Sequence, residues 1–222
     1  MDHPILYGSS FNPPHIGHLA CLILLNKMCP DRPIWVSVSP SRPDKRPFFS
    51  TELRYAWAKE LVSCLHLKGL KAQLLPWSSI PHESHGTWWL LEHLRSQCKI
   101  ESEREVFKVT IALGADSYLT LPQWGGHFLD LKDTTTSIYA DFLVIPRHVN
   151  LNPEPFLNAV THFAPPLDFL ASSLEEWAID GVLCKEASST ALRSLLFKGR
   201  CEEIYRMTLP SIARSLFLEF LD

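Results

Sequence analysis

The sequence predicts an α/β protein with a doubly wound parallel sheet and a helical C-terminal tail. Short apolar runs rich in β-formers alternate with segments of helical periodicity, and no repeat, linker or low-complexity block interrupts them. The last part of the chain has helical periodicity only. Strands that alternate with helices are usually joined by right-handed crossovers, which make the strands parallel. We therefore expect one domain over residues 1–222, with the tail at about 188–222.

Composition limits the function classes. The 222 residues are 46% hydrophobic and 20% charged, which suits a packed core. The net charge of −3 argues against a protein that coats nucleic acid or an anionic membrane, although one local basic pocket stays open. Six cysteines without a C-x-x-C pair predict free buried thiols. The start lacks a cationic secretory signal, and the longest apolar run, 19–25, is too short for a membrane span, so we expect a soluble, cytoplasmic protein.

The individual elements follow from periodicity. The expected strands are the β-rich runs 5–7, 34–38, 70–75, 106–113 and 140–145. The expected helices are 16–28, 51–66, 88–98, 188–197, 201–207 and 210–221. For the helix at 51–66, Ser50 or Thr51 is the expected N-cap, and Leu53, Trp57 and Leu61 form one apolar stripe.

The segment 7–19, Y-G-S-S-F-N-P-P-H-I-G-H-L, is where we expect chemistry. A buried strand ends at Gly8, small residues follow, and a helix begins after two prolines. In an open α/β sheet, ligands bind at the carboxyl ends of strands, where the N–H groups of a helix N-terminus attract phosphate. His15 and His18 are three residues apart, so on a helix they share one face and would point at the same ligand.

Other interpretations of this segment are weaker. A lone H-x-x-H is more often a pair of solvated histidines, but here the pair directly follows a strand and a Gly-Ser-Ser turn. A metal site would need a further ligand nearby, and none is present. The G-x-S-x-G pattern of a hydrolase is also absent.

Three motifs carry a family resemblance. The segment G-S-S-F-N-P-P-H-I-G-H resembles the H-x-G-H signature of nucleotidyltransferases, in the form found in nicotinate and nicotinamide mononucleotide adenylyltransferases. The stretch G-A-D-S at 114–117, followed by Leu121 and Trp124, is similar to a second motif of that family. The stretch S-S-T-A-L-R at 188–193 is similar to a third. The resemblance covers residues 7–217 in the right order, and it implies a Rossmann-like nucleotidyltransferase fold.

The resemblance also implies a reaction and a set of site residues. AMP would pass from ATP to nicotinate or nicotinamide mononucleotide in NAD biosynthesis, pyrophosphate would leave, and Mg²⁺ would be held through phosphates rather than by protein ligands. The implied catalytic residues are His15, His18 and Arg193. The implied ATP-binding residues are Gly8, Ser9, Ser10, Phe11, His15, His18, Gly114, Asp116, Ser188, Ser189, Thr190 and Arg193. The implied mononucleotide-binding residues are Ser10, Asn12, Lys45, Thr87, Trp88, Trp124 and Arg147.

Structural interpretations stand beside these roles. Residues 188–190 are equally typical of an N-cap, and an Asp at the end of a strand, such as Asp116, more often caps a helix. A tryptophan such as Trp124 is more often a core residue. Arg54 matches a family arginine and could instead be an ordinary surface charge.

One departure from the family pattern leaves alternatives open. The usual Y-T-x-D-T-L stretch is replaced here by G-T-W-W-L-L at 86–91, so the acceptor pocket could be rebuilt around Trp88 or Trp89. The alternatives are a related enzyme with another phosphorylated acceptor, such as phosphopantetheine, and an ATP-binding regulator without catalysis. Exposed tryptophans at 88 and 89 would also fit an interface in a homo-oligomer.

Overall fold

The computed structural model describes residues 3–39, 47–79, 86–97, 106–121, 138–146, 161–165 and 186–221. Their strands form one six-stranded sheet in the order β3-β2-β1-β4-β5-β6, and every neighbouring pair is parallel. The strands are β1 (Ile5–Ser9), β2 (Ile34–Val38), β3 (Gln73–Leu74), β4 (Phe107–Gly114), β5 (Ile138–Ile145) and β6 (Thr161–Phe163). The predicted fold class is confirmed.

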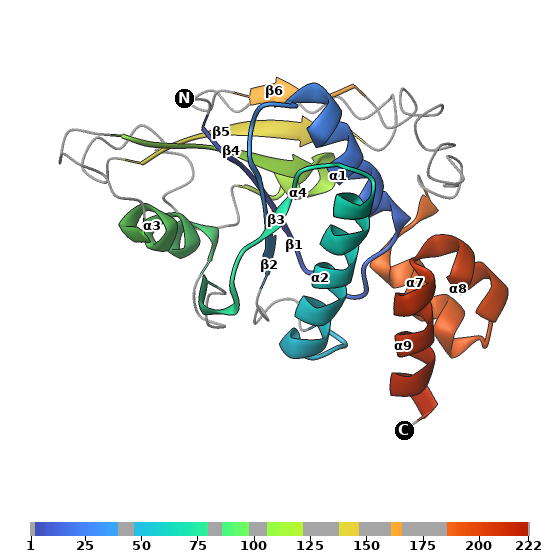
Figure 1. Cartoon of the computed structure of the whole chain (residues 1–222). Coiled ribbons are helices and arrows are strands. Elements are labelled where there is room, and N and C mark those ends of the chain that lie inside the picture. The colour runs from blue at the N-terminus through green and yellow to red at the C-terminus, as the bar shows by residue number, and fades with distance from the viewer. Residues whose placement is uncertain are drawn as a thin grey trace.

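Helices cover both faces of this sheet (Figure 1). On one side lie α1 (Ile16–Met28) and α2 (Thr51–Leu67), and on the other lies α3 (Thr87–Gln97). The tail helices α7 (Ser189–Phe197), α8 (Cys201–Met207) and α9 (Pro210–Leu221) gather beside α2. Two short elements complete the described chain, α4 (Ala115–Leu119) and the 3-10 helix η1 (Trp77–Ser79).

The core has two parts because the sheet is buried on both faces. In β1, Ile5 and Tyr7 join the apolar cluster formed with α1, α2 and the tail helices. Leu6, between them, joins the second cluster with α3 and β4. These three side chains are at most 6% exposed. A strand that is buried on both sides explains why the sequence there is continuously apolar rather than alternating.

Most predicted boundaries are close to the observed ones. The predicted ranges of α1, β2, α8 and α9 are those observed, and α2 begins after Ser50, whose Oγ accepts a hydrogen bond from Leu53 N at 3.2 Å. The expected strand at 70–75 is shorter than predicted, since only Gln73 and Leu74 pair with β2. Three elements, α4, β6 and η1, were not predicted, because each is only a few residues long.

The sheet opens between β1 and β4 at its carboxyl end. Pairing of β1 with β2 continues as far as Ser9 beside Val38. Pairing of β1 with β4 ends two residues earlier, at Tyr7 beside Ala112, although β4 continues to its own last residue in register with β5. The strand order also reverses here, and open α/β sheets bind ligands at such a switch point.

Two further expectations concern thiols and membranes. Cys21, Cys29, Cys64 and Cys201 are free thiols, as predicted, but the prediction that they are buried is wrong, since the first three are half-buried and Cys201 is exposed. The other cysteines, at 98 and 184, lie outside the described residues. Among the helices that the structure describes, none is long and apolar enough to cross a bilayer.

Candidate active site

Two histidines form the N-terminal cap of α1. His15 is the N-cap residue, and its Nδ1 accepts a hydrogen bond from Gly17 N at 3.2 Å. In return, His15 N donates to His18 Nδ1 at 3.1 Å. This reciprocal arrangement is a capping box, usually built from Ser or Thr with Glu or Gln, and it satisfies backbone donors that a helix start leaves unpaired. The histidines therefore begin the helix as well as occupying the predicted site.

The caps also fix how both rings are oriented. Because each Nδ1 accepts a backbone N–H, each neutral ring carries its proton on Nε2. The ring centroids are 3.8 Å apart and the ring planes are inclined by 41°. His15 and His18 are only 4% and 8% exposed. The expected proximity of the two rings is thus observed, and that both donate to one phosphate stays a prediction.

The turn before the helix is held in an unusual backbone conformation. Phe11 has a φ of 47°, which is uncommon for a residue with a side chain. Its ring is fully buried and lies 4.9 Å from the His18 ring, centroid to centroid. The Oδ1 of Asn12 accepts a hydrogen bond from Phe49 N at 3.0 Å, so this buried amide joins the turn to the segment before α2. Local sequence alone would not impose this geometry.

The start of α7 lies against the same turn. Ser188 caps α7, and its Oγ accepts from Ala191 N at 3.0 Å, so the N-cap interpretation of this residue is confirmed. Arg193 donates through Nη1 to the carbonyl of Asn12 and through Nη2 to Thr190 Oγ1. Burial, by removing water from the guanidinium, lowers the pKa of Arg193 below its ordinary value. Two helix N-termini and an arginine therefore meet at one turn, as a polyphosphate site needs.

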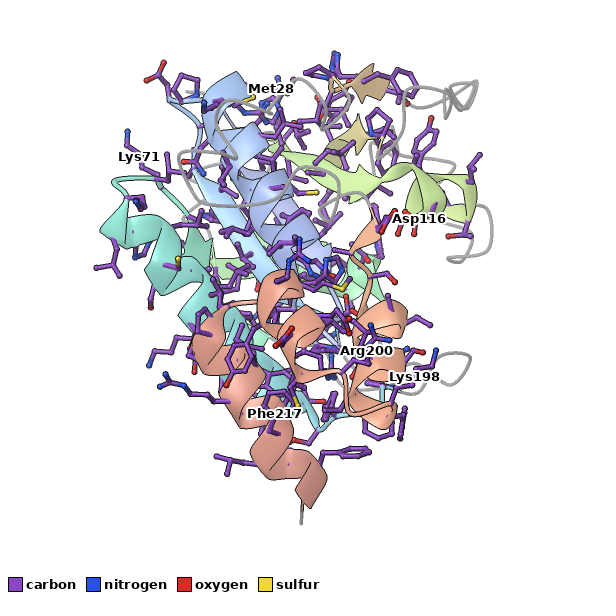
Figure 2. All side chains as sticks on the ribbon, turned by 90° about the vertical axis from the view of Figure 1, so that its right-hand side faces the viewer. Met28, Lys71, Asp116, Lys198, Arg200 and Phe217 are labelled. Carbon is purple, nitrogen blue, oxygen red and sulfur yellow. The ribbon has the colours of Figure 1, made fainter. Side chains whose placement is uncertain are left out.

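The end of β4 contributes a glycine and a carboxylate. Gly114 is the residue before α4, and Asp116 lies exposed in the first turn of that helix. A Cβ at Gly114 would lie 2.6 Å from Asp116 Oδ1, so the glycine leaves room for this carboxylate. Figure 2 shows Asp116 above the tail helices, which carry the labelled Lys198 and Arg200. Gly8 differs, because it is exposed and a Cβ there would meet nothing within 4 Å.

The structure describes only some of the residues predicted to bind the mononucleotide. Lys45, Trp124 and Arg147 lie outside the described residues. Thr87 begins α3, and Trp88 donates through Nε1 to Glu92 Oε1 at 3.1 Å while packing against the second core cluster.

The tryptophan pair at the start of α3 is less exposed than expected. Trp89 stacks on His93, with ring centroids 5.0 Å apart. Trp88 and Trp89 are both half-buried rather than exposed, and a homo-oligomer stays a prediction.

Arg54 lies beneath the site rather than on the surface. Its side chain is 0% exposed, so the surface-charge alternative is wrong. Its Nη1 donates to the carbonyls of Ser10 and Ser39, each at 2.7 Å, and its Nε donates to the carbonyl of Phe49 at 3.2 Å. Burial lowers the pKa of Arg54 to about 10. A signal was present in the sequence, because position 54 precedes Trp57 by three residues on the apolar stripe of α2.

The described residues offer donors for an anion rather than a cage for a metal ion. Within the described ranges, no group of three His, Cys, Asp or Glu side chains could hold a metal. The groups that converge on the turn are imidazole N–H, guanidinium and hydroxyl groups. Such donors match phosphate oxygens.

The strand order, the opening beside β1 and the capped histidine pair together define a Rossmann-like nucleotidyltransferase fold. The sequence model of the cytidylyltransferase-like family matches residues 6–194. The chain therefore belongs to the cytidylyltransferase-like family.

Several similar proteins carry the same printed name. A probable nicotinate-nucleotide adenylyltransferase of Chlorobaculum tepidum is 29% identical over 134 residues, which are 60% of this chain and 66% of that protein. One of Pelodictyon phaeoclathratiforme is 26% identical over 96% of this chain and 87% of its own length. The chain spans 59–66% of the length of the first three such relatives.

Solved structures share the fold. Plasmodium falciparum nicotinic acid mononucleotide adenylyltransferase complexed with NaAD superposes with a TM-score of 0.68 at 18% identity, over 99% of this chain and 96% of that one. The same enzyme complexed with APC gives a TM-score of 0.62. At this identity the similarity establishes the fold.

Proposed function

We propose that this protein is an adenylyltransferase that joins the AMP part of ATP to nicotinate mononucleotide, or to nicotinamide mononucleotide, in NAD biosynthesis. The observation that carries the proposal is the adjacent pair of His15 and His18, whose Nδ1 atoms both accept backbone N–H groups, beside the opening between β1 and β4. The names of the relatives support both the reaction class and the pyridine mononucleotide as acceptor.

The reaction needs positioning and charge neutralisation rather than a covalent enzyme intermediate. A phosphate oxygen of the mononucleotide attacks the α-phosphorus of ATP and forms a new P–O bond. The bond from that phosphorus to the α–β bridging oxygen breaks, and pyrophosphate leaves with the electron pair. His15 and His18 donate from Nε2 to phosphate oxygens near the reacting phosphorus, and Arg193 binds the departing pyrophosphate. Each such donor contributes about 10²–10³ to turnover.

Other residues at the turn have supporting roles in this proposal. Before ATP binds, Ser9 Oγ pairs with His18 Nε2 at 2.9 Å, and a phosphate oxygen would replace that hydroxyl. The space in front of Gly8 admits the nucleotide close to the backbone. In the proposal, Asp116 accepts hydrogen bonds from the ribose, and Ser188, Ser189 and Thr190 contribute to binding of the β- and γ-phosphates.

The acceptor would lie on the other side of the turn. Ser10, Asn12 and Thr87 are its described candidates, with Lys45, Trp124 and Arg147 proposed from the family pattern. We infer that Mg²⁺ enters with ATP, bound to its phosphates and to water, and supplies further charge neutralisation. We place the reaction in the cytoplasm, because reducing conditions there keep thiols such as those of Cys21, Cys29 and Cys64 free.

Pyrophosphate release with two acceptors side by side tests the proposal. Purified protein is mixed with Mg²⁺-ATP and either nicotinate or nicotinamide mononucleotide. We expect release with at least one of them, and the ratio of the two kcat/KM values then identifies the substrate. A protein that binds ATP and releases no pyrophosphate with either mononucleotide would overturn the proposal and favour another acceptor or a regulatory role.

A further inference from the structure

Three consecutive backbone carbonyls before His15 are bound by side chains from the C-terminal tail. Arg193 Nη1 donates to the carbonyl of Asn12. Ser189 Oγ donates to the carbonyl of Pro13 at 2.8 Å. Thr208 Oγ1 donates to the carbonyl of Pro14 at 2.8 Å. Both views of the molecule show the tail beside one end of α1, and these contacts identify it as the end that carries the histidines (Figures 1 and 2).

The two prolines explain why the turn depends on side chains from elsewhere. Pro13 and Pro14 have no backbone N–H, so this stretch cannot stabilise itself as a strand or a helix would. Its carbonyls are nevertheless sheltered, since residues 11–15 are all buried, and a buried carbonyl needs a donor. The donors come from the tail.

Thr208 has the most buried position of the three tail residues. It lies just after α8 in extended backbone and is 4% exposed, whereas Ser189 and Arg193 are half-buried. Its hydrogen bond to Pro14 is itself buried. A hydroxyl that is shielded from solvent and directed at the residue before His15 is placed to position the histidine rather than to contact nucleotide.

Arg54 holds the other end of the same turn. Its Nη1 joins the carbonyl of Ser10 to that of Ser39, which follows β2. The turn is therefore fixed from the side of α2 at Ser10 and from the tail at Pro14.

We propose that Thr208 and Arg54 are positioning residues that hold the turn 10–14 so that the Nε2 atoms of His15 and His18 keep their place; this inference rests on the proposed adenylyl transfer. Misplacing a catalytic group by about 1 Å can lower turnover about 100-fold, so loss of either anchor affects catalysis more than stability.

Thr208→Val is the decisive variant, because valine has nearly the shape of threonine and lacks only the hydroxyl donor. We expect its kcat to fall about 10- to 100-fold with a smaller change in the KM for ATP. Thr208→Ser, which keeps the hydroxyl, recovers most of the loss. Arg54→Lys keeps a charge but lacks the separate donors that Nε and Nη2 offer to the carbonyl of Phe49 and to Thr51 Oγ1, so it holds the turn less firmly and lowers kcat in the same direction.

Ser215→Ala is the matched control. Ser215 Oγ accepts from Trp57 Nε1 at 3.0 Å, which also joins the tail to the body but does not touch the turn. We expect the kcat of Ser215→Ala to stay within about twofold of wild type, although its Tm falls about as much as that of Thr208→Val. Equal losses of kcat in Thr208→Val and Ser215→Ala, or no loss in either, would overturn the positioning role.

Amide hydrogen exchange separates this inference from the reaction itself. We expect Thr208→Val to raise deuterium uptake in the peptide that contains residues 10–18, and Ser215→Ala to leave that uptake unchanged. Unchanged uptake in Thr208→Val overturns the positioning role whatever the activity. Raised uptake in Thr208→Val supports the positioning role. If the wild-type protein at the same time releases no pyrophosphate, only the proposed reaction is overturned.

Discussion

Ser9 Oγ lies 2.9 Å from His18 Nε2, so the last residue of β1 contacts the first turn of α1 through the atom proposed to bind ATP. Because His18 Nδ1 already accepts from His15 N, the neutral ring can only donate to Ser9. His18 therefore has two separable roles, one at each nitrogen. Nδ1 caps the helix, and Nε2, which pairs with Ser9 Oγ, is the atom proposed to exchange that hydroxyl for a phosphate oxygen.

Substitutions at His18 separate these two roles. His18→Asn retains an acceptor near the position of Nδ1 but has no donor at Nε2. We expect it to lower kcat about 10²–10³-fold with little change in Tm. His18→Ala loses both, so pyrophosphate release nearly stops and Tm falls as well. The measurements are steady-state pyrophosphate release and thermal unfolding, and an Asn variant within tenfold of wild type would contradict the donor role.

Substitutions at His15 test its role as the N-cap of α1. His15→Ala removes the acceptor for Gly17 N, and we expect the free energy of unfolding to fall by about 0.5–2 kcal/mol. His15→Asn supplies a good capping side chain and is expected to unfold close to wild type, although its turnover falls as in the alanine variant. Urea denaturation measures the difference, and equal stabilities of the two variants would refute the cap.

Arg193→Gln tests the proposed binding of the departing phosphates. A hydrogen bond to a charged group contributes about 1.5–3 kcal/mol, so we expect kcat/KM for ATP to fall roughly 10- to 100-fold. Arg200→Gln is the control, because Arg200 lies exposed on the same tail and pairs with Glu203 (Figure 2). A comparable loss in both variants would point to general surface charge instead of a specific contact.

His3, just before β1, is expected to make the stability of the protein depend on pH. His3 Nε2 lies 2.9 Å from Thr110 Oγ1, and burial, with the charge of Arg32, lowers the pKa of His3 below 6.5 despite the opposing effect of Asp141. Below pH 6.5 the unfolded chain therefore binds more protons at this residue than the folded one, so stability falls as the pH drops towards the folded pKa.

His3→Gln should flatten this dependence. We expect the variant to lose less stability than wild type when the pH is lowered from about 7 to about 5, because its side chain does not titrate. Urea unfolding at a series of pH values measures it. Parallel curves for the two proteins would show that His3 does not contribute.

Local signals predicted the elements that position the site. The range of α1 followed from two prolines and an apolar run, and residue type limited the N-cap of α2 to Ser50 or Thr51, of which the structure has Ser50. Gly8 and the histidine pair could be assigned to the end of a strand and the start of a helix, the places where phosphate binding is predicted. These features depend on neighbours in sequence, so periodicity and capping rules describe them.

Contacts between distant segments could not be predicted in the same way. The position of Arg54 on the apolar face of α2 indicated burial, but the sequence did not show that its guanidinium would meet the carbonyls of Ser10 and Ser39 after β1 and β2. Thr208 carries no motif, and it matters because its hydroxyl reaches Pro14, 194 residues earlier. A local contact was also missed. Gly114 was predicted to bind ATP, and the structure adds a steric reason for a glycine there, because a Cβ would collide with the carboxylate of Asp116.

The tail contacts have a consequence for synthesis of the protein. Chains emerge from the ribosome N-terminus first, and domains begin to fold as they do so. The turn that carries His15 emerges early, but its partners at Ser189, Arg193 and Thr208 are made 176–194 residues later. A nascent chain can thus build β1 and α1 long before it can bind nucleotide in the proposed way. In this proposal, competence arises only after residues 189–208 have been made, so shorter nascent chains would not yet hold the turn in place.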